Sequence, residues 1–392
     1  MNLSAYALQY RQDLYQRLIP FWLEFGIDPV YGGYFCVISS KGEVCTSDKW
    51  IEWHAQQAWA FAKLYQQSSD AQYLKCASQG ADFLLQYGMD AKENWWAVVD
   101  CVGHGVSEVI DTKAEAAAVS CWSVLYQITQ EEIYAESAKK TLIKAFRKRE
   151  KRLQKRADDV ISGRYLKNIS ELSALAKALV SAKQIIGEKT FKEKAEQLFQ
   201  ELMKHFWEPR ADIFLENVFS EGGYSDCLEG RHIHPGRVFE AFNAFYELTK
   251  ITNKRRIRQQ LAQHVAYLAE TTWDEAYGGY FGWLDIKSLP PTQPEAYYKY
   301  AWVQLEATTA LLRAYQVLND RTLLKHWQRV NDYMWQHFAD NSKEGEWVGV
   351  LSRHGEPLFG MKATPEKSAF YPVKNLLESA DLLEILQDIN TP

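Results

Sequence analysis

Four short segments combine polar and aromatic side chains just before an apolar helical pattern, which is a favourable place for chemistry. The first is Trp53–Trp59, where His54, Gln56 and Trp59 could face a cavity. The others are Gly230–Glu240, Tyr300–Glu306 and Lys362–Tyr371. The alternative for each is an ordinary packed core, because a buried Trp and a satisfied His are common there. The pattern therefore selects candidates and leaves their roles open.

The second segment has the clearest local chemistry. Pro235 suits the first turn of a helix, where its missing N–H costs nothing. Arg237 and Glu240 are then three residues apart on one face of the opening turn. The helix dipole makes this end receptive to negative charge. His232 and His234 form a His-x-His pair, but no third ligand stands nearby in the sequence, so we expect no metal.

The third segment places a carboxylate, Glu306, beside an aromatic ring, Trp302. Trp302 and Glu306 are four residues apart and share a helix face, with Gln304 between them. A carboxylate can hold a sugar hydroxyl while the ring covers the apolar face of the sugar. Aromatic residues make up 14% of the chain, which suits sugar binding but is equally compatible with a core of large side chains.

An internal repeat indicates how these segments are positioned. Residues 28–35 (DPVYGGYF) reappear at 274–281 as DEAYGGYF. The paired glycines permit a backbone reversal, and Tyr-Phe favours a short extended piece. Degenerate copies begin near Gly88, Asp158, Glu208 and Asp340. The joins recur every roughly 50–70 residues, a period long enough for two helices and their loops.

Between the joins, apolar residues recur at i, i+3, i+4 and i+7, the period of a helix. The four clearest sets are Ala58, Phe61, Ala62 and Tyr65; Leu172, Leu175, Ala176 and Leu179; Val238, Ala241, Phe242 and Phe245; and Ala307, Ala310, Leu311 and Ala314. Six such units without polar capping repeats predict a ring that closes on itself. The predicted fold is all-α, a closed (α/α)6 barrel of six helical hairpins with short β-hairpins in the loops.

The composition excludes several classes of protein. A net charge of −5 gives no pull toward nucleic acid, and the basic run Lys144–Arg156 is interpreted as the solvated face of an outer helix. We find no signal peptide and no membrane-spanning segment. The six cysteines occur singly, which favours packing roles in a reduced cytoplasm. No Gly/Ser-rich or Pro-rich linker divides residues 1–392, so we expect one domain.

Together the four segments resemble the N-acylglucosamine 2-epimerase superfamily over almost the whole chain. Residues 231–236 (RHIHPG) are similar to the family's Arg-His-Ile-Asn-Pro-Gly. Residues 302–306 resemble its Trp-Pro-His-x-Glu segment, and residues 362–370 its Lys-Gly-Gly-Pro-x-Lys-Gly-x-Phe segment. The resemblance implies a six-hairpin barrel, a small sugar substrate, no obligatory cofactor and a possible homodimer. Members of the family move the proton next to an open-chain carbonyl, which interconverts C2 epimers or aldoses and ketoses.

The chain departs from this family at its acid and base positions. The family's histidines fall on Arg237, Gln304 and Tyr371, and its arginine falls on Gln56. Arg stays protonated, and Tyr has a reference pKa of about 10, so neither replaces histidine as a base without strong activation. The matching positions, by contrast, keep the family's residues: Glu240, Glu306, Trp59, Trp302 and Lys367.

Three functions remain open on this reading. The first is a divergent sugar epimerase or isomerase, with Glu240 and Glu306 as acid/base groups whose pKa values are raised by burial. In it Arg237 holds a carbonyl oxygen, a ring oxygen or an anionic substituent, and Tyr371 donates a proton. The expected substrate-binding residues are His54, Gln56, Trp59, Arg231, His232, Trp302, Gln304 and Lys367. The others are a glycoside hydrolase or lyase, which also uses two carboxylates, and a sugar-binding protein without catalysis.

Overall fold

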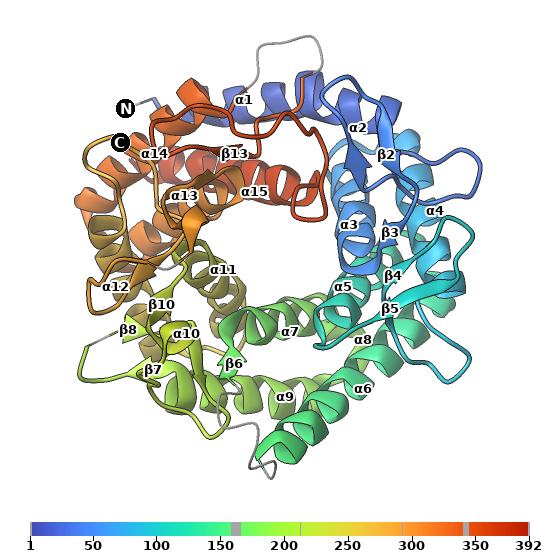
Figure 1. Ribbon diagram of the computed structural model, residues 1–392, viewed down its shortest axis with the longest axis horizontal. Coiled ribbons are helices and arrows are strands. Elements are labelled where there is room, and N and C mark those ends of the chain that lie inside the picture. Colours follow the sequence, from blue (N-terminus) through green and yellow to red (C-terminus); the bar gives the residue numbers. More distant parts are fainter. Residues whose placement is uncertain (1, 158–165, 212, 292, 340–344, 391–392) are drawn as a thin grey trace.

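The computed structural model describes residues 2–157, 166–211, 213–291, 293–339 and 345–390. In these ranges the chain is mostly helical, as the apolar spacing predicts. Two sets of helices lie one inside the other (Figure 1). The inner set contains α3 (Ile51–Ser68), α5 (Lys113–Thr129), α7 (Ile169–Ser181), α11 (Pro235–Ile251), α13 (Ala301–Leu318) and α15 (Phe370–Asn390).

Each inner helix packs against the next one around a central axis. Contacts run from α3 to α5, α7, α11, α13 and α15, and α15 in turn contacts α3. The outer set contains α1 (Leu3–Asp13), α4 (Ala71–Tyr87), α6 (Glu132–Ala157), α9 (Glu188–Glu201), α12 (Arg255–Thr271) and α14 (Arg321–His337). Five outer helices follow their inner partner in the sequence, whereas α1 packs on α15 from the other end of the chain. The first and last helices of the chain, α1 and α15, therefore form the sixth pair of outer and inner helices.

The apolar stripes predicted from the sequence are the buried faces of the inner helices. All four members of the sets beginning at Leu172, Val238 and Ala307 are buried, as are Ala58, Phe61 and Ala62. Tyr65 is only partly buried against this core. Inner helices pack against both the axis and the outer layer, so they bury more than one face. None of the described helices is both long and apolar enough to cross a membrane.

Shorter helical pieces connect these elements. They are the α-helices α2 (Ile19–Phe25), α8 (Lys183–Ile186) and α10 (Leu228–Arg231), the π-helical turns η1 (Leu14–Leu18) and η3 (Leu202–Phe206), and the 3₁₀ turn η4 (Pro294–Tyr297). The predicted joins at Gly88 and Glu208 lie in connections between helices. The joins predicted at Asp158 and Asp340 lie outside the described residues.

The strands are short, and all their pairings are antiparallel. They are β1 (Val37–Ile38), β2 (Val44–Thr46), β3 (Lys49–Trp50), β4 (Trp96–Val99), β5 (Gly105–Glu108), β6 (Leu166–Asn168), β7 (Trp207–Glu208), β8 (Ile213–Phe214), β9 (Asn217–Phe219), β10 (His232–Ile233), β11 (Leu284–Asp285), β12 (Lys299–Tyr300) and β13 (Val350–Leu351). The pairs β1–β2, β4–β5 and β7–β8 are hairpins, as predicted. However, β6–β9, β10–β11 and β12–β13 join strands separated by whole helices, so sheets also tie different connections together.

The basic run in α6 matches the prediction of a solvated face only in part: Arg147 and Lys151 are exposed, but other cations of the run turn inward. Arg149 is 4% exposed and forms a double contact with Glu201 at 2.7 Å. Arg152 reaches Glu171 at 2.6 Å, and Lys148 reaches Glu115 at 2.6 Å. The described part of this run therefore fastens α6 through ion pairs to the inner helices α5 and α7 and to the outer helix α9. The side chains of residues 155 and 156 lie outside the described part.

Candidate functional site

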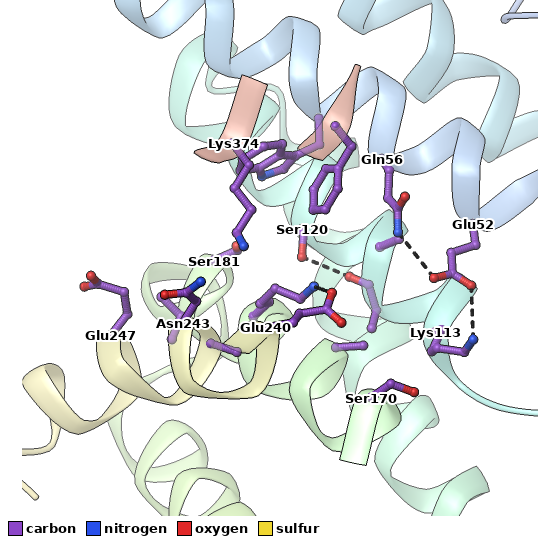
Figure 2. Close-up of a pocket in the computed structure, with 18 of the residues that line it drawn as sticks. Glu52, Gln56, Lys113, Ser120, Ser170, Ser181, Glu240, Asn243, Glu247 and Lys374 are labelled. Carbon is purple, nitrogen blue, oxygen red and sulfur yellow. Dashed lines mark hydrogen bonds and ion pairs between the residues drawn. The ribbon is translucent and has the colours of Figure 1, made fainter. Parts of the chain in front are cut away.

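A cavity of about 800 Å³ lies where the inner helices begin. It narrows into a deeper pocket of about 140 Å³ between those helices, shown in Figure 2. Both spaces are lined by Glu52, Gln56, Lys113, Ser170 and Arg237, all in the first two turns of their helices. The ring thus gathers side chains from distant parts of the sequence around one axial space.

Six of the twelve site residues predicted from the sequence line this axial space. Gln56 and Trp59 come from α3, Arg237 and Glu240 from α11, Trp302 from α13 and Tyr371 from α15. Trp59 meets Phe370 edge-on, with ring centroids 5.1 Å apart. Gln56 donates to the Glu52 carboxylate at 3.3 Å.

Glu240 is an ion-pair anchor, contrary to the expectation of an acid with a raised pKa. Its Oε1 accepts from Lys177 Nζ at 2.8 Å, and its Oε2 accepts from Arg237 Nη1 at 3.2 Å. Tyr371 donates its O–H to the same Oε1 at 3.5 Å. Burial acts to raise the pKa of Glu240, but the charges of Lys177 and Arg237 outweigh it and hold the pKa far below its usual value. A carboxylate in this state stays ionised and is a poor proton donor.

Arg237 connects the charged and aromatic parts of the cavity. Its guanidinium carbon lies 4.8 Å from the centre of the Trp302 ring, a cation–π arrangement. Trp302 in turn packs on Tyr371, with ring centroids 5.3 Å apart. The Arg237 charge also acts on Glu52, Glu216 and Glu240, so these carboxylates share one electrostatic environment. Arg237 therefore both pairs with Glu240 and faces the cavity.

Glu306 does not line the axial space, although it was predicted as an acid/base group. Its side chain is fully buried among the inner helices, where Lys374 Nζ contacts both carboxylate oxygens at 2.6 and 2.8 Å. Asn243 and Asn375 donate to it at 2.8 and 3.2 Å. With its oxygens satisfied in this way, Glu306 positions Lys374, which does line the deep pocket.

His54 and Gln304 support the repeated glycine loops and do not line the cavity. His54 is fully buried between Tyr34 and Phe83, with ring centroids 4.6 and 4.7 Å away. Gln304 accepts from the Tyr280 N–H at 2.9 Å and donates to the Tyr280 carbonyl at 3.1 Å. Both hold the Gly-Gly-Tyr turn of their own repeat, so their predicted role in substrate binding is corrected to a supporting one.

The other three predicted residues also lie away from the axial space. Arg231 donates to Asp285 at 3.0 Å on the β10–β11 edge. His232 is buried on β10, and its Nδ1 lies 3.0 Å from the side-chain amide of Gln293. Lys367 lines a neighbouring cavity of about 560 Å³ that shares Trp302 and Tyr371 with the main one. Within the described ranges, no group of three His, Cys, Asp or Glu could hold a metal ion.

His234 is a functional candidate that was not among the site residues predicted from the sequence. Its side chain lines the cavity between Trp283 and Trp302, with ring centroids 4.6 and 4.8 Å away. Burial, helped by the charge of Arg237, holds the pKa of His234 well below its usual value. The imidazole is therefore neutral near neutral pH, the form that can accept a proton. The sequence offered one signal for this role, because His234 directly precedes Pro235 and so lies at the start of an inner helix.

Two carboxyl groups of the cavity have the raised pKa that was predicted for Glu240. Burial raises the pKa of Glu52, and Lys113, 3.7 Å away, only partly offsets it. Burial likewise raises the pKa of Glu216. Its Oε2 accepts a hydrogen bond from the backbone N–H of His234 at 2.9 Å. Neither residue belongs to a recognisable motif. Glu52 could have been found as the only acid in the first turn of α3.

The chain matches known proteins over most of its length. A family model described as N-acylglucosamine 2-epimerase matches residues 32–374. N-acylglucosamine 2-epimerase of Mus musculus is 26% identical over 402 residues, which cover 98% of this chain and 93% of that protein. Cellobiose 2-epimerase from Bacillus thermoamylovorans has a TM-score of 0.81 at 19% identity and covers 97% of this chain and 100% of that one. A D-mannose isomerase has a TM-score of 0.76 at 18% identity, with 97% of each chain covered.

Proposed function

Because the chain belongs to the N-acylglucosamine 2-epimerase family, we propose that it is a sugar epimerase or aldose–ketose isomerase that works inside a closed (α/α)6 barrel formed by residues 1–392. The proposal depends on one observation: a neutral His234 and the Arg237 cation line the same cavity, beside carboxyl groups with raised pKa. A base next to a fixed positive charge is what proton abstraction beside a carbonyl requires.

In the proposed reaction, His234 takes the proton from C2 of the open-chain sugar. The electron pair of the C2–H bond moves into a new C1–C2 double bond, and the carbonyl oxygen becomes an enediolate oxygen. Arg237 stabilises this oxyanion with a charge that is already in place. Burial, with the nearby Glu240 charge, raises the pKa of Tyr371 well above its usual value, so its phenol keeps the proton and can donate a hydrogen bond.

Glu52 completes the reaction as the second acid/base group. Its raised pKa increases the fraction of protonated carboxyl at neutral pH. Delivery of that proton to the opposite face of C2 gives the epimer. Delivery of a proton to C1, with transfer of the C2 hydroxyl proton to the oxygen on C1, gives the ketose instead. Gln56 and Trp59 are the proposed sugar contacts, and Glu240 is a positioning residue for Arg237.

Uptake of deuterium from heavy water tests this proposal. The panel contains N-acetylglucosamine, cellobiose, mannose, fructose, glucose 6-phosphate and glucuronate, and mass spectrometry follows label at C1 and C2. We expect uptake with at least one sugar and a loss of about 100-fold in His234→Gln, the size of a missing general base. The matched control is His54→Gln, which removes a buried histidine outside the cavity and should retain the label uptake.

The same panel separates the other functions. Release of reducing ends from cellobiose without label would indicate a hydrolase. Sugar binding measured by calorimetry, with neither label nor product, would indicate a binding protein. Label uptake that His234→Gln leaves intact would contradict the assignment of His234 as the base.

A further inference from the structure

The deep pocket contains two cations that share one carboxylate. Lys177 and Arg237 both donate to Glu240, from opposite sides of its carboxyl group. Their pKa values are raised because Glu240 outweighs the opposing effect of burial, so both remain charged. The group of Lys177, Arg237 and Glu240 therefore carries one net positive charge inside the protein.

The neighbouring charges do not cancel this excess. Lys374 is balanced by Glu306, and Lys113 lies 3.7 Å from Glu52, so neither pair offsets the charge around Glu240. Farther along the pocket, Arg313 lies 3.0 Å from Glu247 and 3.4 Å from Glu378. These two carboxylates are 37% and 34% exposed, so solvent screens them. Among the described residues that line the deep pocket, the positive charge is concentrated around Glu240.

The side chains of Lys177 and Arg237 are 22% and 32% exposed, so water in the pocket screens the excess charge only in part, and an anionic ligand compensates the rest. An ammonium carries three N–H donors, and Lys177 gives one of them to Glu240. The pocket of about 140 Å³ exceeds the 10–15 Å³ or so that one water needs, which leaves room for a small oxyanion. It continues directly from the cavity that holds His234 and Arg237.

We propose that this deep pocket binds the anionic substituent of an acidic sugar, a carboxylate or a phosphate, through Lys177 and Lys374. This inference rests on the proposed function, because it places the sugar carbonyl at His234 and Arg237 and the anion below them. The substrate class is then a sugar acid or sugar phosphate. A neutral sugar would leave the charge of Lys177 without a partner from the ligand.

Binding by calorimetry tests the inference independently of catalysis. The probes are glucose, glucose 6-phosphate and glucuronate, each titrated into the full-length wild-type protein. We expect at least one acidic sugar to bind 10-fold or more tightly than glucose. A preference for glucose 6-phosphate alone identifies phosphate, and a preference for glucuronate alone identifies carboxylate. Equal affinity for all three probes would overturn the inference.

Two lysine variants make the test specific. Lys177→Met keeps the length of the side chain and removes its charge, and we expect it to abolish the preference for the acidic sugar. Lys192→Met is the matched control, since Lys192 is 68% exposed on α9 away from the pocket. A preference that survives Lys177→Met would overturn the inference. Preferred binding of an acidic sugar without label uptake would instead contradict the proposed function and leave this inference standing.

Discussion

Two loop-and-helix units, residues 28–58 and 274–308, are built alike but present different side chains to the axis. In each, an Asp at the loop start pairs with a buried Lys before the helix: Asp28 with Lys49 at 2.7 Å and Asp274 with Lys299 at 3.1 Å. Each Lys also donates to a loop carbonyl, of Tyr34 or of Gly279.

The units differ at equivalent positions of α3 and α13, counted from the buried Lys. Glu52 corresponds to Trp302, His54 to Gln304, and Gln56 to Glu306. At the first position both side chains line the cavity, one as an acid with a raised pKa and one as an aromatic wall. At the second, both support the loop. At the third, Gln56 lines both spaces, whereas Glu306 is buried against Lys374 and lines neither. Position along the helix therefore decides where the side chain lies at the first two positions, whereas at the third the residue type and its partner from α15 decide it.

The largest expected effect comes from removing the buried lysines. Lys49→Met leaves Asp28 without its cation and should cost about 3–5 kcal/mol of unfolding free energy. Lys299→Met should cost less, about 1–3 kcal/mol, because Arg353 still contacts Asp274 at 2.9 Å. Urea unfolding followed by circular dichroism measures both. The double variant Lys299→Met with Arg353→Gln should match Lys49→Met, and equal losses in the two single variants would refute the compensation by Arg353.

The second expected effect is a difference in kinetics between variants of Glu52 and Trp302, the two equivalent residues that line the cavity. Glu52→Gln should slow product formation about 100-fold, because it removes a proposed proton donor. Trp302→Phe keeps an aromatic wall and should change kcat by less than about 3-fold, with its main effect on KM. Steady-state kinetics on the sugar that takes up label provides the measurement. The assignment of Glu52 fails if Trp302→Phe lowers kcat as much as Glu52→Gln does.

The third effect concerns the glycine turns. Gly32 and Gly33 both have positive φ, but a Cβ on Gly33 would lie 2.2 Å from His54 Cε1, whereas a Cβ on Gly32 meets nothing within 4 Å. Gly33→Ala should therefore cost about 1–3 kcal/mol more than Gly32→Ala. In the other unit, Gly279→Ala should fall between them, because its Cβ would approach Tyr333 at 2.6 Å. Urea midpoints that rank Gly32→Ala as the most damaging would contradict this packing.

The smallest effect is a difference in acid sensitivity. Burial, with the charge of Lys49, holds the pKa of His54 well below the usual 6.5. Below pH 6.5 the unfolded chain takes up a proton at this position and the folded chain does not, so stability falls as the pH is lowered. His54→Gln, which copies Gln304, should remove about 1.4 kcal/mol per pH unit from that slope. Urea unfolding between pH 5 and 7 tests this, and a slope unchanged by His54→Gln would show that the pKa of His54 is the same in the folded and the unfolded chain.

Much of the architecture could be predicted from the sequence because local patterns determine it. The apolar spacing of Leu172–Leu179 and the glycine repeat require only neighbouring residues. The role of Glu240 could not be predicted, since its ionisation depends on Lys177, 63 positions earlier. Glu306 was misplaced for the same reason, because Lys374 reaches it from α15. His234 was recognised as a histidine, but its enclosure by Trp283 and Trp302 arises only in the folded ring.

The most direct test of the central claim is a crystal structure with a bound open-chain analogue such as glucitol. We expect C2 of the ligand to lie within hydrogen-bond reach of a His234 ring nitrogen, with the neighbouring oxygen at Arg237. A ligand held in the axial cavity with C1 and C2 beside Glu240 and Tyr371 but out of reach of His234, or a ligand outside the cavity altogether, would contradict it.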